Sequence, residues 1–349
     1  MVKEIVICGS MGESVDGQTI KTLRMAEALE AIEGSVLRVN MAHFKCKPCK
    51  AVWQMAQALF KGDVFILMPG SNSIRLLLPL FAWWKKHRKV LLVYVGVGGW
   101  LQDRLKKDHF LRECARCIDA FYMENAYTLH ELDELGFSSC HHLPNFRNFN
   151  PRTLPRFRSK PHARPKLLFF SRITPEKGVE RCIRSVAQLL KEFPLCCQLD
   201  LYGPIAKNYK RAFLKLLDEA PAGIHYGGIL EPSDASLYQQ LSDYDLLVFP
   251  TFYEGEGMSG AMIECLVAGV PVLASNWKGN AQLITPGRNG LLFELDQQNE
   301  PYATLKMLIF EPKMLERLRR ETHQQFQHYH GPTLVREMLI NLRCLAKTK

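Results

Sequence analysis

Three glutamates, Glu254, Glu256 and Glu264, lie in a glycine-rich stretch between two apolar runs, LLVFPTFYEGEGMSGAMIECLVAGVPVLAS at residues 246–275. Glu256 precedes a predicted helix, and Glu264 lies about one turn inside it. Carboxylates at these places can each accept hydrogen bonds from a pair of vicinal hydroxyls, which suits a sugar. Small residues surround three backbone amides that can approach a polyol closely, those of Gly257, Met258 and Ser259. The alternative is a helix N-terminus whose acids complement the helix dipole.

Two cations flank a turn in the string SRITPEKG, which follows an apolar run at residues 166–170. Arg172 and Lys177 lie on either side of Pro175, and a helix is predicted from Gly178. Charge-assisted hydrogen bonds, together with the aligned amide dipoles of a helix N-terminus, suit a diphosphate. Taken alone, the motif is also compatible with an ordinary surface pair of basic residues.

A third glycine-containing loop, GESVDGQT at residues 12–19, follows the first apolar run of the chain. It has the frame of a phosphate-binding loop, but Gln18 stands where the lysine of that motif belongs. We therefore expect no hydrolysis of nucleoside triphosphates. Backbone N–H groups near Gly17 can still bind an oxyanion at the helix start. A plain glycine turn is the alternative.

Three short motifs raise the question of a metal. The pairs Cys46–Cys49 and Cys114–Cys117 are separated by 64 residues, far beyond the spacing of a zinc ribbon. Asp243-Tyr-Asp245 has the spacing of a metal–nucleotide motif, but it lies at the amino end of a predicted strand, away from the ligand-binding edge. We expect no bound metal and free thiols.

Strand-like and helical segments alternate along both halves of the chain, which indicates parallel sheets with helices on both faces. In the first half, strands are predicted at 4–9, 36–40, 64–68, 90–95 and 120–123, and helices at 19–31 and 52–60. In the second half, strands are predicted at 166–171, 198–202, 224–226, 245–250, 270–274 and 290–294. Helices are predicted there at 178–192, 209–220, 233–241, 259–268, 312–328 and 332–346.

The composition changes at PRTLPRFRSKPHARPK, which contains four prolines, six lysines or arginines and no acid. We interpret residues 151–165 as an exposed linker between domains at 1–150 and 166–328, with a terminal helix at 329–349 that packs back on the first domain. The predicted fold is α/β, with two Rossmann-like, doubly wound domains facing each other across a cleft. The motifs follow predicted strands, where open parallel sheets bind ligands.

The composition is that of a globular protein, with 47% apolar and 23% charged residues among 349. The longest apolar runs are too short to span a membrane, and the eleven cysteines without an export signal suggest a cytoplasmic location. The net charge of +10 indicates an anionic partner, such as nucleic acid, a phosphorylated ligand or a membrane surface. Because no nucleic-acid-binding module is present, we do not expect a nucleic acid.

A series of motifs resembles the retaining glycosyltransferases of family four, which have the GT-B fold. In order, these motifs are SRITPEKG, YGGIL, PTFYEGEGMSGAMIE, AGVPVLAS and GRNGLLFE. GQTIKT in the first loop and LPNFRNF at residues 143–149 are similar to the branch that builds bacterial capsule, exopolysaccharide or O-antigen chains. The resemblance covers nearly the whole chain and is more specific in the second domain than in the first.

The resemblance implies a donor, a reaction and roles for named residues. A nucleotide-diphosphate sugar would lie on the C-terminal domain, and a hexose-type sugar would pass with retention, without a metal, to a saccharide or lipid-linked saccharide acceptor. Arg172 and Lys177 would hold the diphosphate, Glu256 the transferred sugar and Glu264 the ribose. Gly17, from the opposing loop, would approach the pyrophosphate or the acceptor side. The loops that contain Gly203 and Tyr226 would border the base.

The first domain departs from the family pattern where many members carry a histidine near the transferred sugar. Here the string VYVGVGGW has Gly98 and Gly99 instead, so that contact does not carry over. Gln18 and Glu124 are candidates for the acceptor side, and a solvated helix start is the alternative for Glu124.

An apolar run at residues 76–84 ends in two tryptophans and is followed by a basic segment. Interfacial aromatics and cations suit an anionic membrane surface, where a lipid-linked acceptor would dock. The candidates are Trp83, Trp84, Lys85, Lys86 and Arg88. The alternative, to which we give equal weight, is a buried helix end with a basic cap.

Two other functions are compatible with the fold. One is a non-catalytic subunit that binds a nucleotide sugar, and the other is a GT-B hydrolase or epimerase of nucleotide sugars. The presence of Arg172, Lys177, Glu256 and Glu264 together favours a transferase.

Overall fold

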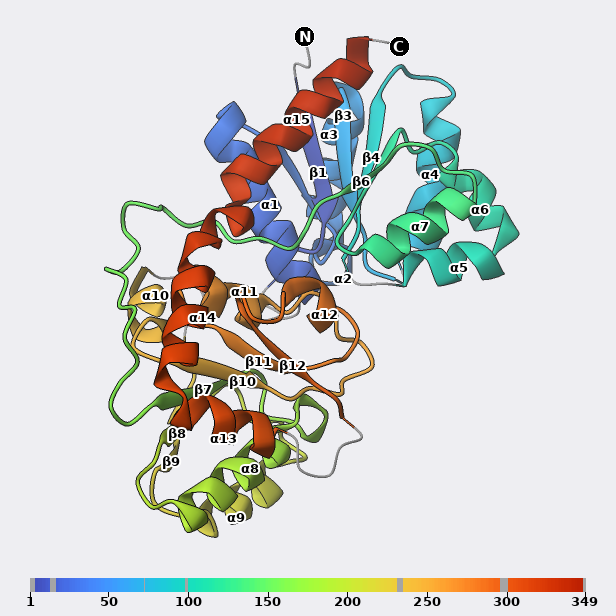
Figure 1. The fold of residues 1–349 in the computed structure, drawn as a ribbon. Helices are drawn as coiled ribbons and strands as arrows, with labels where there is room; N and C mark the ends of the chain where they lie inside the picture. Colours follow the sequence, from blue (N-terminus) through green and yellow to red (C-terminus); the bar gives the residue numbers. More distant parts are fainter. Residues whose placement is uncertain are drawn as a thin grey trace. The chain divides into compact units, whose positions relative to one another are not determined.

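The computed structural model describes residues 4–12, 17–71, 73–97, 100–230, 235–295 and 301–347. The chain divides into two compact units (Figure 1). The N-terminal unit comprises Met1–Asn148 and His330–Lys349, and the C-terminal unit comprises Phe149–Tyr329. Each unit is built on a six-stranded sheet in which all the paired strands are parallel. The predicted α/β architecture with two parallel sheets is confirmed.

The sheet of the N-terminal unit has the strand order β2-β1-β3-β4-β5-β6. Its strands are β1 (Ile5–Gly9), β2 (Leu37–Asn40), β3 (Val64–Met68), β4 (Leu91–Val95), β5 (Ala120–Met123) and β6 (Cys140–His142). Every residue of β1, β3, β4 and β5 is buried, as expected for parallel strands that are covered on both faces.

Two hydrophobic cores lie against this sheet, one with residues of α3 to α7 and one with residues of α1 and α15. The helices are α1 (Gly17–Glu33), α2 (His43–Cys46), α3 (Pro48–Lys61), α4 (Ile74–Lys85), α5 (Leu101–Lys107), α6 (His109–Ala115), α7 (Ala126–Glu134) and α15 (Gly331–Lys347). The last helix of the chain, α15, runs alongside α1 (Figure 1) and buries Val335, Met338, Leu339 and Leu342. The chain therefore returns at its end to the unit in which it began.

The sheet of the C-terminal unit has the order β12-β11-β10-β7-β8-β9. Its strands are β7 (Lys166–Phe170), β8 (Gln198–Tyr202), β9 (Ile224–Gly228), β10 (Leu246–Phe249), β11 (Val272–Ser275) and β12 (Gly290–Phe293). Its helices are η1 (Pro175–Lys177), α8 (Val179–Glu192), α9 (Lys210–Asp218), α10 (Ala235–Leu241), α11 (Gly260–Val267), α12 (Asn280–Leu283), α13 (Tyr302–Phe310), α14 (Pro312–Gln324) and η2 (Phe326–Tyr329).

Residues 151–165, which the sequence predicts as an exposed linker, belong to the C-terminal unit. Arg158 and His162 both contact the carboxylate of Asp245, at 3.1 and 2.8 Å. Arg319 of α14 approaches the same carboxylate to 3.4 Å, and the Asp245 side chain is fully buried. The second acid of the Asp243-Tyr-Asp245 motif therefore anchors this basic segment and α14 to the start of β10.

A second buried charge lies in the N-terminal unit. The ammonium of Lys21 on α1 is 2.7 Å from a carboxylate oxygen of Glu124, and the two side chains are 1% and 2% exposed. Lys21 also donates to the carbonyl oxygen of Gly96, which follows β4. Burial lowers the pKa of Lys21, and the Glu124 carboxylate opposes that shift. The pair joins α1 to the carboxyl ends of β4 and β5.

Gly178 at the end of η1 has both a left-handed backbone conformation and a close contact with a carbonyl group, and the effects of the two can be separated by substitution. It has φ of 77°, and a Cβ there would lie 2.0 Å from the carbonyl oxygen of Pro250. Gly287 of the same unit has φ of 79°, but a Cβ there would meet nothing within 4 Å. We expect Gly287→Ala to lower the free energy of unfolding by about 1–2 kcal/mol through backbone strain. Gly178→Ala should lower it by about 1–3 kcal/mol more, because the carbonyl must move. Equal losses in urea denaturation would contradict this.

The Lys21–Glu124 pair predicts strong energetic coupling. Lys21→Met should lower the free energy of unfolding by about 3–5 kcal/mol, because the buried Glu124 carboxylate loses the ammonium that lies 2.7 Å from it. Lys21→Met with Glu124→Gln should cost clearly less than the sum of the two single changes. The matched control is the exposed pair Glu180–Arg184 on α8, for which coupling below about 0.5 kcal/mol is expected. Additive losses at the buried pair in urea denaturation would refute the coupling.

Candidate functional site

A lysine and a glutamate meet at the carboxyl ends of β7 and β10. Lys177 is the last residue of η1, and Glu256 lies in the loop that follows β10. The ammonium nitrogen of Lys177 is 2.5 Å from Oε2 of Glu256, and the side chains are 8% and 6% exposed. The hydroxyl of Thr251 donates to the same oxygen at 2.7 Å. The structure thus brings together two residues that the sequence assigned to one site.

An aromatic ring contacts both cations of the site. The centroid of the Tyr253 ring lies 4.8 Å from the ammonium of Lys177 and 5.6 Å from the guanidinium carbon of Arg172. Arg172 itself is exposed. A ring face at this distance stabilises a cation by about 0.5–2 kcal/mol. Tyr253 therefore holds a buried and an exposed cation on one side of the site.

Burial determines the electrostatics of this cluster. It lowers the pKa of Lys177, while the Glu256 carboxylate opposes the shift and the nearby Arg172 guanidinium adds to it. An anion that reaches Arg172 and Lys177 would meet two positive groups, of which Lys177 is already paired with the Glu256 carboxylate. Such a cluster can bind a diphosphate and can release the Glu256 carboxylate toward hydroxyl groups.

Backbone contacts fix the loops that carry these side chains. The amide of Phe252 donates to the carbonyl oxygen of Glu176 at 2.8 Å, which joins the loop after β10 to η1. A Cβ on Gly203 would lie 1.8 Å from the carbonyl oxygen of Ser171, and its φ is 144°. Glycine at this position therefore lets the ends of β7 and β8 lie against each other.

The other candidates of the glycine-rich stretch lie at the start of α11. Glu264 is in the second turn of that helix and is buried. The Met258 side chain belongs to the hydrophobic core, so the groups it can offer to a ligand are those of the backbone. Ser259 precedes the first residue of α11, and a Cβ on Gly279 would lie 2.6 Å from the carbonyl oxygen of Gly257.

Two further candidates contact each other at the ends of β8 and β9. The phenol of Tyr226 donates to the carbonyl oxygen of Gly203 at 2.8 Å, and its ring packs edge-on against Phe213. The loops that the resemblance places around the base are thus joined by a hydrogen bond.

The candidates of the N-terminal unit serve mainly as structural contacts. Gly17 begins α1 and is exposed, and the side-chain amide of Gln18 donates to the carbonyl oxygen of Met68 at the end of β3. The structure corrects both predictions for Glu124. That residue is neither at a solvated helix start nor open to hydroxyls, because it is buried against Lys21. Gly98, Gly99 and residues 13–16 lie outside the described residues.

The predicted membrane-facing segment also needs correction. Trp84 packs edge-on against Phe65 and Phe81 in the core, and Lys85 pairs with Asp119 at 2.5 Å. Adjacent helical residues point about 100° apart, so Trp83 and Trp84 cannot share one face. Trp83 is 62% exposed.

The two remaining residues of that segment, Arg88 and Lys86, also differ in their surroundings. The guanidinium of Arg88 donates to the carbonyl oxygens of Leu59 and Phe60, which commits it to the end of α3. Lys86 is exposed. Of the five predicted residues, the outward-facing aromatic is Trp83, and Lys86 is an exposed cation beside it.

Within the described ranges, no helix combines the length and apolar character needed to cross a membrane. Among the same residues, no group of three or more His, Cys, Asp or Glu side chains is placed to hold a metal ion.

Residues 164–309 match the family model described as glycosyl transferases group 1. The GDP-mannose-dependent monoacylated alpha-(1-6)-phosphatidylinositol monomannoside mannosyltransferase of Corynebacterium glutamicum is 25% identical over 58% of this chain and 56% of its own length. The D-inositol 3-phosphate glycosyltransferase of Paenarthrobacter aurescens is 28% identical over 42% of this chain and 36% of its own length. The chain spans 33–56% of the length of the curated relatives it matches.

Solved structures share the fold of nearly the whole chain, although their sequence identity to it is low. Anabaena HepE in complex with UDP has a TM-score of 0.72 at 14% identity, covering 98% of this chain and 100% of that chain. Sucrose-phosphate synthase from Thermosynechococcus elongatus has a TM-score of 0.74 at 15% identity, covering 99% and 100%. The chain therefore has the α/β fold of GT-B glycosyltransferase structures, and its residues 164–309 match glycosyl transferases group 1.

Proposed function

We propose that this protein is a glycosyltransferase that moves a hexose-type sugar from a nucleotide-diphosphate sugar to a saccharide or lipid-linked saccharide acceptor. The observation that carries the proposal is the buried Lys177–Glu256 pair beside Arg172, in the segment that matches glycosyl transferases group 1. A paired lysine and glutamate with an exposed arginine next to them offer cations to a diphosphate and a carboxylate to a sugar.

The diphosphate of the donor binds Arg172 and Lys177, close to the start of α8. As Lys177 turns toward the phosphate oxygens, the carboxylate of Glu256 accepts hydrogen bonds from the hydroxyls of the sugar. The cations stabilise the charge that develops on the leaving diphosphate, a preorganised electrostatic role for which no metal is required. Glu264 holds the ribose, and the amides of residues 257–259 contact the sugar.

The transfer proceeds with retention. The acceptor oxygen forms its bond to the anomeric carbon on the face from which the diphosphate departs, and the acceptor proton passes to the departing phosphate oxygen. Glu256 positions the sugar through its hydroxyls, and in this same-face transfer no protein carboxylate forms a bond to the anomeric carbon.

Two features support the choice of substrates and setting. Anabaena HepE was solved with UDP and with UDP-glucose, and the names of the two curated relatives above contain phosphatidylinositol monomannoside and D-inositol 3-phosphate. We propose a role in bacterial surface polysaccharide synthesis at the cytoplasmic face of the membrane. Exposed Trp83 and Lys86 would then lie at the lipid surface.

Donor binding is tested by thermal denaturation with a panel of UDP-, GDP-, CDP- and ADP-sugars. A matching donor should raise the Tm of the wild-type protein by mass action. Arg172→Gln should weaken that donor about 10- to 100-fold, because one charge-assisted contact to the diphosphate is lost. Arg184→Gln, which removes an exposed arginine of α8, should leave binding unchanged. An undiminished shift in Arg172→Gln would refute the assigned diphosphate site.

The reaction class is tested by release of nucleoside diphosphate with and without acceptor. Release that requires the acceptor, with a product of the same anomeric configuration as the donor by NMR, is the expected result. Release without acceptor would indicate a hydrolase, and binding without release would indicate a non-catalytic subunit. An inverted product would contradict the same-face transfer.

A further inference from the structure

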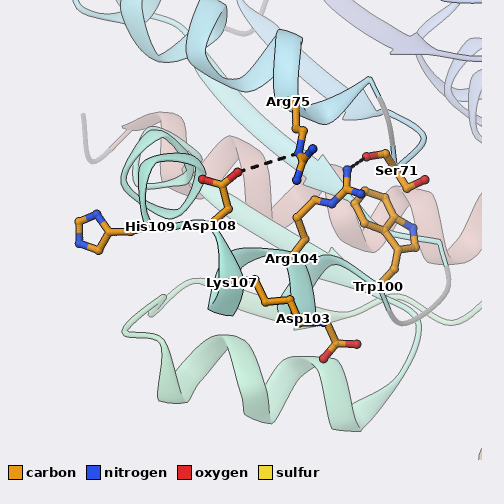
Figure 2. Close-up of a pocket in the computed structure, with 8 residues that line it drawn as sticks. All are labelled: Ser71, Arg75, Trp100, Asp103, Arg104, Lys107, Asp108 and His109. Carbon is orange, nitrogen blue, oxygen red and sulfur yellow. Dashed lines mark hydrogen bonds and ion pairs between the residues drawn. The ribbon is translucent and has the colours of Figure 1, made fainter.

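A pocket of about 470 Å³ lies in the N-terminal unit (Figure 2). Its lining comes from segments that follow two neighbouring strands. Ser71 follows β3, Trp100 follows β4, and further residues come from α4, α5 and the start of α6. The carboxyl ends of parallel strands are where open α/β sheets bind ligands, and the volume falls within the range of small-molecule sites.

Three cations line this pocket, Arg75, Arg104 and Lys107. Figure 2 shows the guanidinium groups of Arg75 and Arg104 pointing toward one another from α4 and α5. Two guanidinium groups that point into one space repel each other unless an anion lies between them. The pocket therefore presents the electrostatic conditions of an anion site.

The acids of the pocket compensate these cations only in part. The carboxylate of Asp108 is 4.0 Å from Arg75, and its other oxygen accepts the amide of Leu111 as the N-cap of α6. Arg104 donates to the carbonyl oxygen of Ser71, a neutral group. Among the described residues, Lys107 has no ion pair. Asp103 is the second acid, so three cations face two carboxylates.

An indole ring lies beside these charges. The guanidinium carbon of Arg104 is 5.9 Å from the centroid of the Trp100 ring. Trp100 is half-buried and packs with one part against the hydrophobic core. A fixed aromatic surface next to cations suits a ligand with an apolar face and an anionic group, and the C–H face of a pyranose that carries a phosphate meets both conditions.

We infer that this pocket binds the phosphate of a phosphorylated saccharide, which deepens the proposed function by assigning the class of acceptor and which rests on it. A tetrahedral phosphate can accept hydrogen bonds from Arg75 and Arg104, whose guanidinium groups point toward one another from α4 and α5, and Lys107 adds a third positive charge to the lining. The sugar ring lies on Trp100.

The binding test is acetylation of lysines by a short pulse of reagent, mapped by mass spectrometry. Glucose 1-phosphate is the probe. It should slow acetylation of Lys107 several-fold while leaving Lys86 and Lys89, which are exposed outside the pocket, unchanged. Glucose should protect nothing. Protection by glucuronate equal to that by glucose 1-phosphate would replace the phosphate assignment with a general carboxylate site and overturn the proposal.

Variants separate this pocket from the donor site, which also offers cations. Arg75→Gln with Arg104→Gln should abolish the protection of Lys107, whereas Arg172→Gln should leave it intact. The matched control is Lys86→Gln with Lys89→Gln, which removes the same charge from the same unit and should keep the protection. Equal acetylation of Lys107 with and without the probe, or loss of protection in Arg172→Gln, would overturn the assignment.

The two proposals fail in different ways. Protection of Lys107 without sugar transfer from any donor would support the phosphate pocket and refute the proposed transferase function. Acceptor-dependent transfer with an unchanged KM for a phosphorylated acceptor in the Arg75→Gln/Arg104→Gln variant would leave the transferase and reject the pocket.

Discussion

The interaction on which the candidate site depends is a salt bridge that is almost wholly excluded from water. Removing a lysine and a glutamate from solvent costs free energy, and their attraction offsets that cost only when the geometry is good and further hydrogen bonds are made. Thr251 donates such a hydrogen bond to Glu256, and the ring face of Tyr253 adds a cation–π contact with Lys177. A pair of apolar residues of similar size would fill the same space at a lower cost in desolvation free energy, so the presence of two charges here is an argument for chemistry rather than for stability.

The sheet supplies the rigidity that this pair requires. β7 and β10 are neighbours in the middle of the sheet, and both are apolar and buried. The turn after β7 brings Lys177 over the end of β10 because Gly178 lets the Pro250 carbonyl approach. Two buried strands and Gly178 thus fix the positions from which the polar side chains of the site extend.

Much of the fold could be predicted from sequence because buried parallel strands are short continuous apolar runs. The strand over 64–68 was predicted with its observed bounds, whereas β11 begins at Val272 rather than at 270, since the intervening Pro271 cannot donate a ladder hydrogen bond. β6 was missed because its residues, Cys-His-His, are polar or half-exposed at a sheet edge. Propensity and pattern contain no signal for such a strand.

The sequence could predict which residues belong to the candidate site, but not which side chains they contact. Arg172, Lys177 and Glu256 follow strands and carry charge, which the sequence shows. The contacts of Tyr253 with both cations depend on the path of a loop, and Lys21 and Glu124 are separated by 103 positions in the chain. Trp84 and Lys85 were misplaced because a run of apolar and basic letters does not reveal which side of a helix meets the core.

The return of α15 to the first unit has a consequence for biosynthesis. The chain passes between the units twice, at 148–149 and at 329–330, so the N-terminal unit is discontinuous. Domains fold in order as the ribosome releases them, but α1 waits for α15, which emerges only after the whole C-terminal unit. The N-terminal unit is therefore completed only after the C-terminal unit has emerged, and a chain cut before residue 330 would leave the apolar face of α1 uncovered.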